Sequence, residues 1–211
     1  IRDFEWMIDM REGVLRRSFV VEMSKGQVFS VETERFCSMD QPEIAALRYT
    51  IRVLNDSMLV ELKPYLDGNV HNEDSNWDDA FWSFHAAETN EEGHGLVHSE
   101  TEKSGFHAAL SMANGVHLSQ GGESISVPVA SHDTQNARTE CGFTCNLEKN
   151  DAVVLEKFVG VLTSLQMEVN SIAKHAKSIA VAAMSQGFDQ LKSNHVAAWS
   201  DVWSRADIRI Q

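Results

Sequence analysis

The most constraining feature of this chain is a change in the period of its apolar residues near Ser164. Before that point, apolar and polar residues alternate in short runs separated by turns rich in Gly, Asn and Asp, which is typical of antiparallel strands. After it, apolar residues recur every three to four positions, which is typical of amphipathic helices. The sequence therefore predicts a mainly β fold followed by two helices.

The alternating runs predict two β-hairpins and several further strands. The first hairpin pairs residues 14–23 with 28–36, and the second pairs residues 47–53 with 58–62. The remaining expectations are a short helical turn at 42–46, strands at 81–87, 95–102, 106–113, 124–129, 141–147 and 152–162, and turns at 91–93, 114–115 and 121–122. Strands this numerous and closely spaced favour an antiparallel β-sandwich or barrel, and we expect the sandwich.

Two helices are expected after the strands, at residues 169–185 and 188–203, with Gly187 between them. Trp199 and Trp203 are four positions apart, so they share one face of the second helix. Core packing is the leading interpretation of this pair. Sugar stacking and contact with another part of a longer chain are the alternatives.

Both ends of the chain fall inside expected structural elements. Ile1 begins within an alternating stretch that runs to Met10, which predicts an interior strand of a larger sandwich. Residues 206–211 have the pattern of a strand or linker without a partner. We expect a β-sandwich domain at residues 1–165 that lacks its first strands, and a helical linker at residues 166–211.

Composition excludes several classes of protein. The net charge is -13, and acidic residues crowd positions 61–103, which disfavours binding to nucleic acid. The chain has no run of about 18 apolar residues, so no membrane span is predicted. Its first residues do not have the pattern of a signal peptide. Three cysteines are too few for a disulfide framework. A cytoplasmic protein with reduced thiols is expected.

Five histidines lie close together in the sequence and raise the question of a metal site: His85, His94, His98, His107 and His117. His94 and His98 would share one face of a helix, but their neighbours predict a strand. Positions four apart on a strand are about 13 Å apart, which is too far for one ion. We therefore expect no bound metal, and a metal-dependent enzyme remains an alternative hypothesis.

Acidic and aromatic residues adjoin at Asp78, Asp79, Phe81 and Trp82, a combination found in sugar sites. Trp82 and Asp78 are therefore the candidate substrate-binding residues. The competing interpretation is an acidic loop anchored by buried aromatic rings. No phosphate-binding glycine loop, nucleophile elbow or catalytic triad pattern is present, so we expect no catalytic residue in this chain.

Segments spread along the chain resemble, in the same order, the amino-terminal part of glycoside hydrolase family 65. They are residues 8–17, 31–39, 45–49, 66–70, 155–158 with 163–164, and 195–203 followed by 206–208. Residues 80–145 match the family least. The resemblance implies a large sandwich of the supersandwich type, similar to galactose mutarotase, and then a helical linker leading into a barrel of paired helices.

The resemblance also implies a function. Family members mostly cleave α-linked glucose disaccharides such as maltose, trehalose or kojibiose with inorganic phosphate, giving β-glucose 1-phosphate with inversion. The catalytic acid and the phosphate-binding residues lie in the barrel, and no Glu here matches the general-acid motif. The chain is thus expected to be a non-catalytic domain that shapes the sugar site and supports a homodimer, with phosphate as co-substrate of the parent enzyme and no other cofactor.

An independent carbohydrate-binding sandwich is the alternative. Five tryptophans favour it, because flat aromatic rings can stack on sugars. Trp6, Trp77 and Trp82 are the first positions at which a bound sugar is expected.

Overall fold

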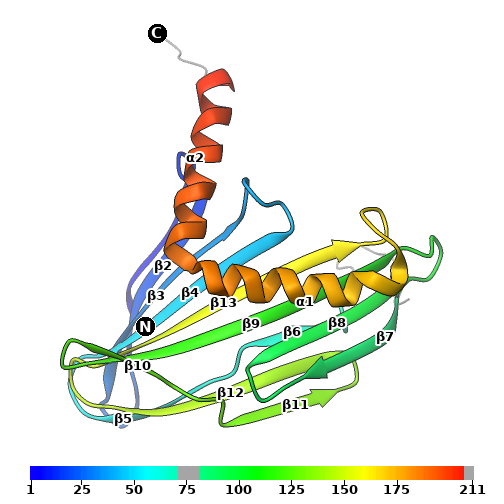
Figure 1. The fold of residues 1–211 in the computed structure, drawn as a ribbon. Coiled ribbons are helices and arrows are strands. Elements are labelled where there is room, and N and C mark those ends of the chain that lie inside the picture. The colour runs from blue at the N-terminus through cyan, green and yellow to red at the C-terminus, as the bar shows by residue number, and fades with distance from the viewer. Residues whose placement is uncertain (71–80, 207–211) are drawn as a thin grey trace.

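The computed structural model describes residues 1–70 and 81–206 as two antiparallel β-sheets and two helices (Figure 1). The larger sheet contains nine strands, in the order β1 (Arg2–Asp9), β2 (Val14–Glu22), β3 (Val28–Cys37), β4 (Ile44–Val53), β13 (Ala152–Thr163), β9 (His107–Gln120), β8 (His94–Thr101) and β7 (Trp82–Thr89), with β10 (Glu123–Ser126) paired to β9. The smaller sheet contains β11 (Ser131–Gln135), β12 (Arg138–Leu147) and β5 (Met58–Leu62), and β6 (Tyr65–Asp67) also pairs with β12. The predicted antiparallel sandwich is confirmed.

The main hydrophobic core lies between the two sheets. Val31, Ile51 and Val153 from the large sheet pack in one buried cluster with Phe143 and Leu147 from the small sheet. Alternate residues of each strand face this core, as the period-2 pattern requires. We call this side of the large sheet its inner face and the opposite side its outer face.

Helix α1 (Val169–Gln186) covers part of the outer face, where it lies across β13, β9 and β8 (Figure 1). Its buried residues recur at helical spacing: Ile172, Ala176, Ala180 and Ala183. The small side chains bring the helix close to the sheet. A Cβ on Gly160 of β13 would lie only 2.5 Å from the carbonyl oxygen of Ala176.

Helix α2 (Phe188–Ala206) follows α1 after Gly187, whose φ of 83° lets the chain change direction. It rises away from the large sheet near β2, β3 and β4 (Figure 1). Phe188 and Leu191 anchor its first turns in a second buried cluster with Val14, Phe36 and Phe158. Both predicted helices and the break between them are confirmed.

The predicted second hairpin is wrong. β4 pairs with β3 and β13 in the large sheet, whereas β5 pairs with β12 in the small sheet. The turn between them therefore crosses from one sheet to the other. The side chain of Asn55 attaches this turn to the β2–β3 turn: it accepts a hydrogen bond from the Val28 amide and donates one to the Gly26 carbonyl.

Two smaller predictions also fail. The Asn114-Gly115 pair is not a turn but lies in the middle of β9, where buried Asn114 donates to the carbonyl of Gly93. Residues 42–46 form a turn that enters β4 rather than a helical turn. Strand β11 had no predicted counterpart, because its residues are polar and exposed throughout.

The expected division at residue 165 falls between the end of β13 and the start of α1. The separation into two domains remains a prediction, since both helices share buried clusters with the sheet. β1 pairs with β2 alone in the described residues, so its place inside a larger sandwich also remains a prediction. No helix in the described ranges is both long and apolar enough to cross a bilayer.

Candidate functional site

Several side-chain hydrogen bonds and ion pairs lie where α2 meets the large sheet. We call it the junction and define it by Met10 and Gly13 in the β1–β2 turn, by the cross-strand row Arg16, Glu34, Arg48 and Glu156, and by Asp189, Lys192, His195, Trp199 and Trp203 of α2. Most of these residues belong to the segments that carry the family resemblance. Segments far apart in the sequence therefore meet at one place.

Trp199 and Trp203 share one face of α2, as predicted. Their rings pack edge to face with centroids 6.0 Å apart. Both indole N–H groups donate to the carbonyl oxygen of Met10, at 2.6 and 2.8 Å. A single carbonyl with two lone pairs thus ties the helix to the β1–β2 turn.

His195 is buried one turn earlier on α2. Its Nδ1 accepts a hydrogen bond from the Met39 amide, and its Nε2 lies 3.1 Å from the carbonyl oxygen of Gly13. Because Nδ1 accepts and a carbonyl cannot donate, the ring is neutral and carries its proton on Nε2. The ring stacks on Phe36 with centroids 4.8 Å apart. This arrangement gives His195 a structural role.

Gly13 makes the close approach of His195 possible. Its φ is +67°, and an added Cβ would lie 2.9 Å from Nε2 of the histidine. A residue with a side chain would therefore be strained here and would also push the ring away.

A row of alternating charges crosses the outer face beneath α2. Arg16, Glu34, Arg48 and Glu156 stand directly opposite one another on β2, β3, β4 and β13. Opposite charges in facing positions stabilise neighbouring strands. Arg48 donates to Glu156 at 2.8 and 2.6 Å, and Arg16 donates to Glu34 at 3.0 Å.

Helix α2 completes this row with two charges of its own. Asp189 accepts two hydrogen bonds from Arg48, at 2.8 and 2.9 Å, and Lys192 donates to Glu34 at 2.8 Å. Burial raises the pKa of Glu34, but the bonds from Lys192 and Arg16 outweigh it and hold the pKa below its usual value. The hydrogen bonds from Arg48 likewise lower the pKa of Asp189.

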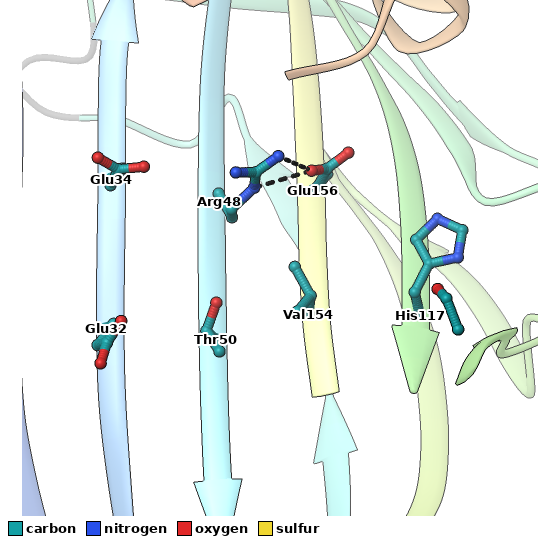
Figure 2. A pocket seen from close by; sticks show the side chains of 8 residues that line it. Glu32, Glu34, Arg48, Thr50, His117, Val154 and Glu156 are labelled. Atoms are coloured by element: carbon teal, nitrogen blue, oxygen red, sulfur yellow. Dashed lines mark hydrogen bonds and ion pairs between the residues drawn. The ribbon is translucent and has the colours of Figure 1, made fainter. Parts of the chain in front are cut away.

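Glu34, Arg48 and Glu156 of this row line a polar hollow of about 460 Å³. Figure 2 shows their side chains with those of the neighbouring strands. The walls of the hollow are side chains of β3, β4, β13, β9 and the β10 segment: Glu32, Glu34, Arg48, Thr50, His117, Ser124, Val154 and Glu156. The lowered pKa holds Glu34 as a carboxylate, which does not suit it to donate a proton, and Glu156 accepts hydrogen bonds from Arg48. The hollow could admit a small polar molecule, but it does not present an assembled acid–base pair.

An apolar groove of about 550 Å³ lies on the inner face, between the β1–β2 turn, the ends of β3, β4 and β13, and the two tryptophans of α2. Leu15, Arg35, Leu47 and Lys157 face one another across the four strands at its base. Burial lowers the pKa of Lys157 to about 8. An open apolar surface of this kind is typical of a contact with another domain or chain.

Of the predicted sugar residues, only Trp6 and Trp82 lie in the described part, on strands at opposite edges of the large sheet, so the predicted sugar site stays a prediction. Trp82 begins β7, is half-buried and lines neither hollow. Asp78, and Trp77 with it, lie outside the described residues. Trp6 lies on edge strand β1 with 67% of its surface exposed.

The histidines that lie together in the structure are not the pair that the sequence spacing singles out. His94 pairs with nearby Glu92, whereas His98 meets His85 and His107 from the neighbouring strands. Burial, and then the neighbouring His107 and His85, lower the pKa of His98. Sequence spacing along one strand could not show this group, because its members come from three strands.

The fold and the junction define a class: an antiparallel β-sandwich domain with a helical extension fixed to its large sheet. The sequence pattern described as "Glycosyl hydrolase family 65, N-terminal domain" matches residues 1–202. The chain therefore belongs to glycoside hydrolase family 65, as the ordered segments predict.

Individual relatives agree with this assignment. Maltose phosphorylase of Bacillus subtilis (strain 168) is 31% identical over 212 residues, covering 99% of this chain and 26% of its own length. Kojibiose phosphorylase of Caldanaerobacter subterraneus subsp. tengcongensis is 24% identical, covering 99% of this chain and 28% of its own length. The chain thus spans about a quarter of the length of these curated relatives.

A solved structure shares the fold. A protein assigned as a kojibiose phosphorylase from the human microbiome superimposes with a TM-score of 0.81 over 96% of this chain and 25% of that one, at 14% identity. At this identity the likeness concerns the fold alone.

Proposed function

We propose that this chain is the non-catalytic amino-terminal domain of a family 65 disaccharide phosphorylase, and that the junction fixes the direction in which α2 leaves the sandwich. The observation that carries the proposal is the double attachment of α2, by the charge row on the outer face and by the Met10 and Gly13 carbonyls. A helix bound to one sheet through so many separate groups serves as a rigid connection to the domain that follows it.

The chemistry belongs to the parent enzyme in this proposal. Its substrate is an α-glucoside disaccharide, its co-substrate is inorganic phosphate, and its catalytic acid lies in a barrel of paired helices. The apolar groove beside Trp199 and Trp203 is the contact surface for that barrel within the same polypeptide, and the sandwich shapes one side of the sugar site from there. Three free cysteines fit a reducing compartment, so the proposal places the parent enzyme in the cytoplasm.

An activity assay tests the non-catalytic role. The purified chain is incubated with inorganic phosphate and, in turn, maltose, trehalose, kojibiose and nigerose, and glucose 1-phosphate is measured. The proposal predicts no product above the blank. Saturable formation of glucose 1-phosphate by the purified chain would overturn it.

Homodimer formation is the second part of the proposal. Edge strand β1 exposes a set of apolar side chains, Phe4, Trp6, Met7 and Ile8, beside an unpaired strand edge in the described residues. Such edges commonly pair with another strand, and for the purified chain we expect that strand to be β1 of a second copy. Sedimentation of the chain is expected to give a dimer that Trp6→Lys converts to a monomer. A monomer at all concentrations would overturn dimer formation, and a Trp6→Lys variant that stays dimeric would exclude β1 as the contact.

Independent carbohydrate binding is the competing function, and the exposed Trp6 favours it because an accessible indole can stack on a sugar ring. Calorimetric titration with gluco-oligosaccharides separates the two. A saturable isotherm that Trp6→Ala removes and Trp82→Ala leaves intact would support sugar binding at β1. Absence of heat for all sugars would support the scaffold role.

A further inference from the structure

Four side chains that can bind metals meet on the outer face at the β7 edge of the large sheet. They are His85 of β7, His98 and Glu100 of β8, and His107 of β9. Glu100 stands directly opposite His107 in the β8–β9 ladder, and His98 lies two positions along the same strand. His85 lies where the β7–β8 register shifts between Phe84 and Ala86, and a bulge of this kind redirects a side chain.

The distances among these groups suit a shared ion. Nε2 of His85 lies 2.7 Å from Oε2 of Glu100, and Nε2 of His107 lies 3.7 Å from the same oxygen. The donor atoms of these three residues all lie within 4.8 Å of one another. Ligands of a tetrahedral Zn²⁺ are about 3.3 Å apart for bonds of about 2.0–2.1 Å, so small side-chain rotations would complete the site.

His98 is placed to orient one of the ligands. Its Nε2 lies 3.1 Å from Nδ1 of His107, the ring nitrogen that faces away from Glu100. A metal on Nε2 of His107 selects the tautomer in which Nδ1–H donates to His98. Metal-binding histidines usually have such a partner on the second nitrogen, and it raises the basicity of the ligand.

The surroundings fit a bound metal as well. On the same face, Leu96 of β8 and Ala109 of β9 are buried beneath α1 and form an apolar wall beside the cluster. The side chains of His107, Glu100 and His85 are 15%, 31% and 40% exposed, so an ion can enter from solvent. Two imidazoles and one carboxylate prefer Zn²⁺, Co²⁺ or Ni²⁺ to Mg²⁺ or Ca²⁺.

We propose that His85, Glu100 and His107 form a binding site for a divalent transition metal such as Zn²⁺, with water in the fourth position and His98 as the positioning residue. The ion links edge strand β7 to β8 and β9. This site is independent of the proposed scaffold function, and its histidines come from three strands, which is why spacing along the sequence predicted no metal.

Calorimetric titration of the untagged, chelator-treated chain with ZnCl₂ tests the proposal. One saturable site per chain is expected, and MgCl₂ and CaCl₂ should give none. Removing a ligand, in Glu100→Gln, His107→Ala or His85→Ala, should abolish that site. Removing the positioning residue, in His98→Ala, should weaken it about 10- to 100-fold.

His132→Ala is the matched control, because His132 is an exposed histidine on β11 of the other sheet. It should bind Zn²⁺ like the unaltered chain. Thermal unfolding is a second readout. Zn²⁺ should raise the Tm of the unaltered chain and of His132→Ala. It should not raise the Tm of His85→Ala, which lacks the most exposed of the three ligands. No saturable Zn²⁺ binding by the unaltered chain, or unchanged affinity in both Glu100→Gln and His107→Ala, would overturn the proposal.

Discussion

His195 shows at the scale of one residue how the junction is held. Both of its ring nitrogens are engaged by backbone groups, the Met39 amide and the Gly13 carbonyl, and the ring is 2% exposed. Buried polar groups that lose their partner destabilise a protein by about 1–3 kcal/mol each. The histidine therefore specifies one placement of α2 rather than simply filling space.

His195→Phe should lower the free energy of unfolding by about 2–4 kcal/mol, because it keeps the ring but leaves the Met39 amide and the Gly13 carbonyl unpaired. His195→Gln should lower it less, since the amide can replace one of the two bonds. Urea unfolding followed by tryptophan fluorescence measures both. The control His175→Phe, at an exposed position on α1, should change stability by at most about 0.5 kcal/mol. Equal stability of His195→Phe and the unaltered chain would contradict the structural role.

Lys157 provides a pH-dependent test at the same scale. Burial lowers its pKa from the ordinary 10.5 to about 8, so the folded chain binds fewer protons than the unfolded chain between these values. The free energy of unfolding should thus gain a contribution as pH rises from about 8 to 10.5, on the order of 1–3 kcal/mol. Below pH 8 the charged lysine destabilises the fold by that amount.

Lys157→Met should be more stable than the unaltered chain at pH 7, and the difference should shrink toward pH 10.5. The comparison between variants is needed because burial raises the pKa of Cys141 and Cys145, which gives an opposite slope with pH. Lys174→Met, on the exposed face of α1, is the control and should show no such trend. Urea unfolding at several pH values measures the difference, and a constant difference from pH 7 to 10.5 would exclude the lowered pKa.

At the scale of elements, the packing of α1 on β13 depends on small residues at the point of contact. A Cβ at Gly160 would lie 2.5 Å from the Ala176 carbonyl oxygen and 3.1 Å from the Ala180 amide nitrogen. Backbone atoms cannot move aside as a flexible side chain can. The helix as a whole would have to shift.

Gly160→Ala should lower the free energy of unfolding by about 1–3 kcal/mol, the usual range for overpacking. Gly115→Ala is a matched control on β9, where the nearest atom to an added Cβ is a His117 ring nitrogen at 3.6 Å. It should change stability by at most about 0.5 kcal/mol. Thermal unfolding of the two variants gives the comparison, and equal Tm values would show that α1 is not packed as described.

Much of the element order could be predicted from the sequence, because the period of apolar residues reports which side of each element is buried. The change of period at Ser164 gave the two helices nearly to the residue. Pairing could not be obtained in this way. The turn at Asn55 has the composition of a hairpin turn, but the side chain of Asn55 bonds to the β2–β3 turn. Strand β5 pairs instead with β12, about 85 positions later in the sequence.

At the scale of the whole molecule, the junction brings together most of the dispersed segments that carry the family resemblance. Arg16, Glu34, Arg48 and Glu156 come from four strands, and only sheet pairing places them in one row. The same holds for the histidine cluster, whose members meet across β7, β8 and β9. Family membership could be predicted from these segments, but the contacts that they make depend on long-range pairing that one sequence does not reveal.

In our proposal the junction holds α2 as a rigid extension of the sandwich, and native-state hydrogen exchange of the chain measures whether it does. We predict that the amides of residues 190–203 and the indole N–H groups of Trp199 and Trp203 exchange with protection close to that of β4 and β13. Arg48→Ala combined with His195→Phe should reduce the protection of α2 more than that of β9. Rapid exchange throughout α2 in a chain whose sheet amides are protected would contradict the proposal, because the helix would then not be held by the sandwich.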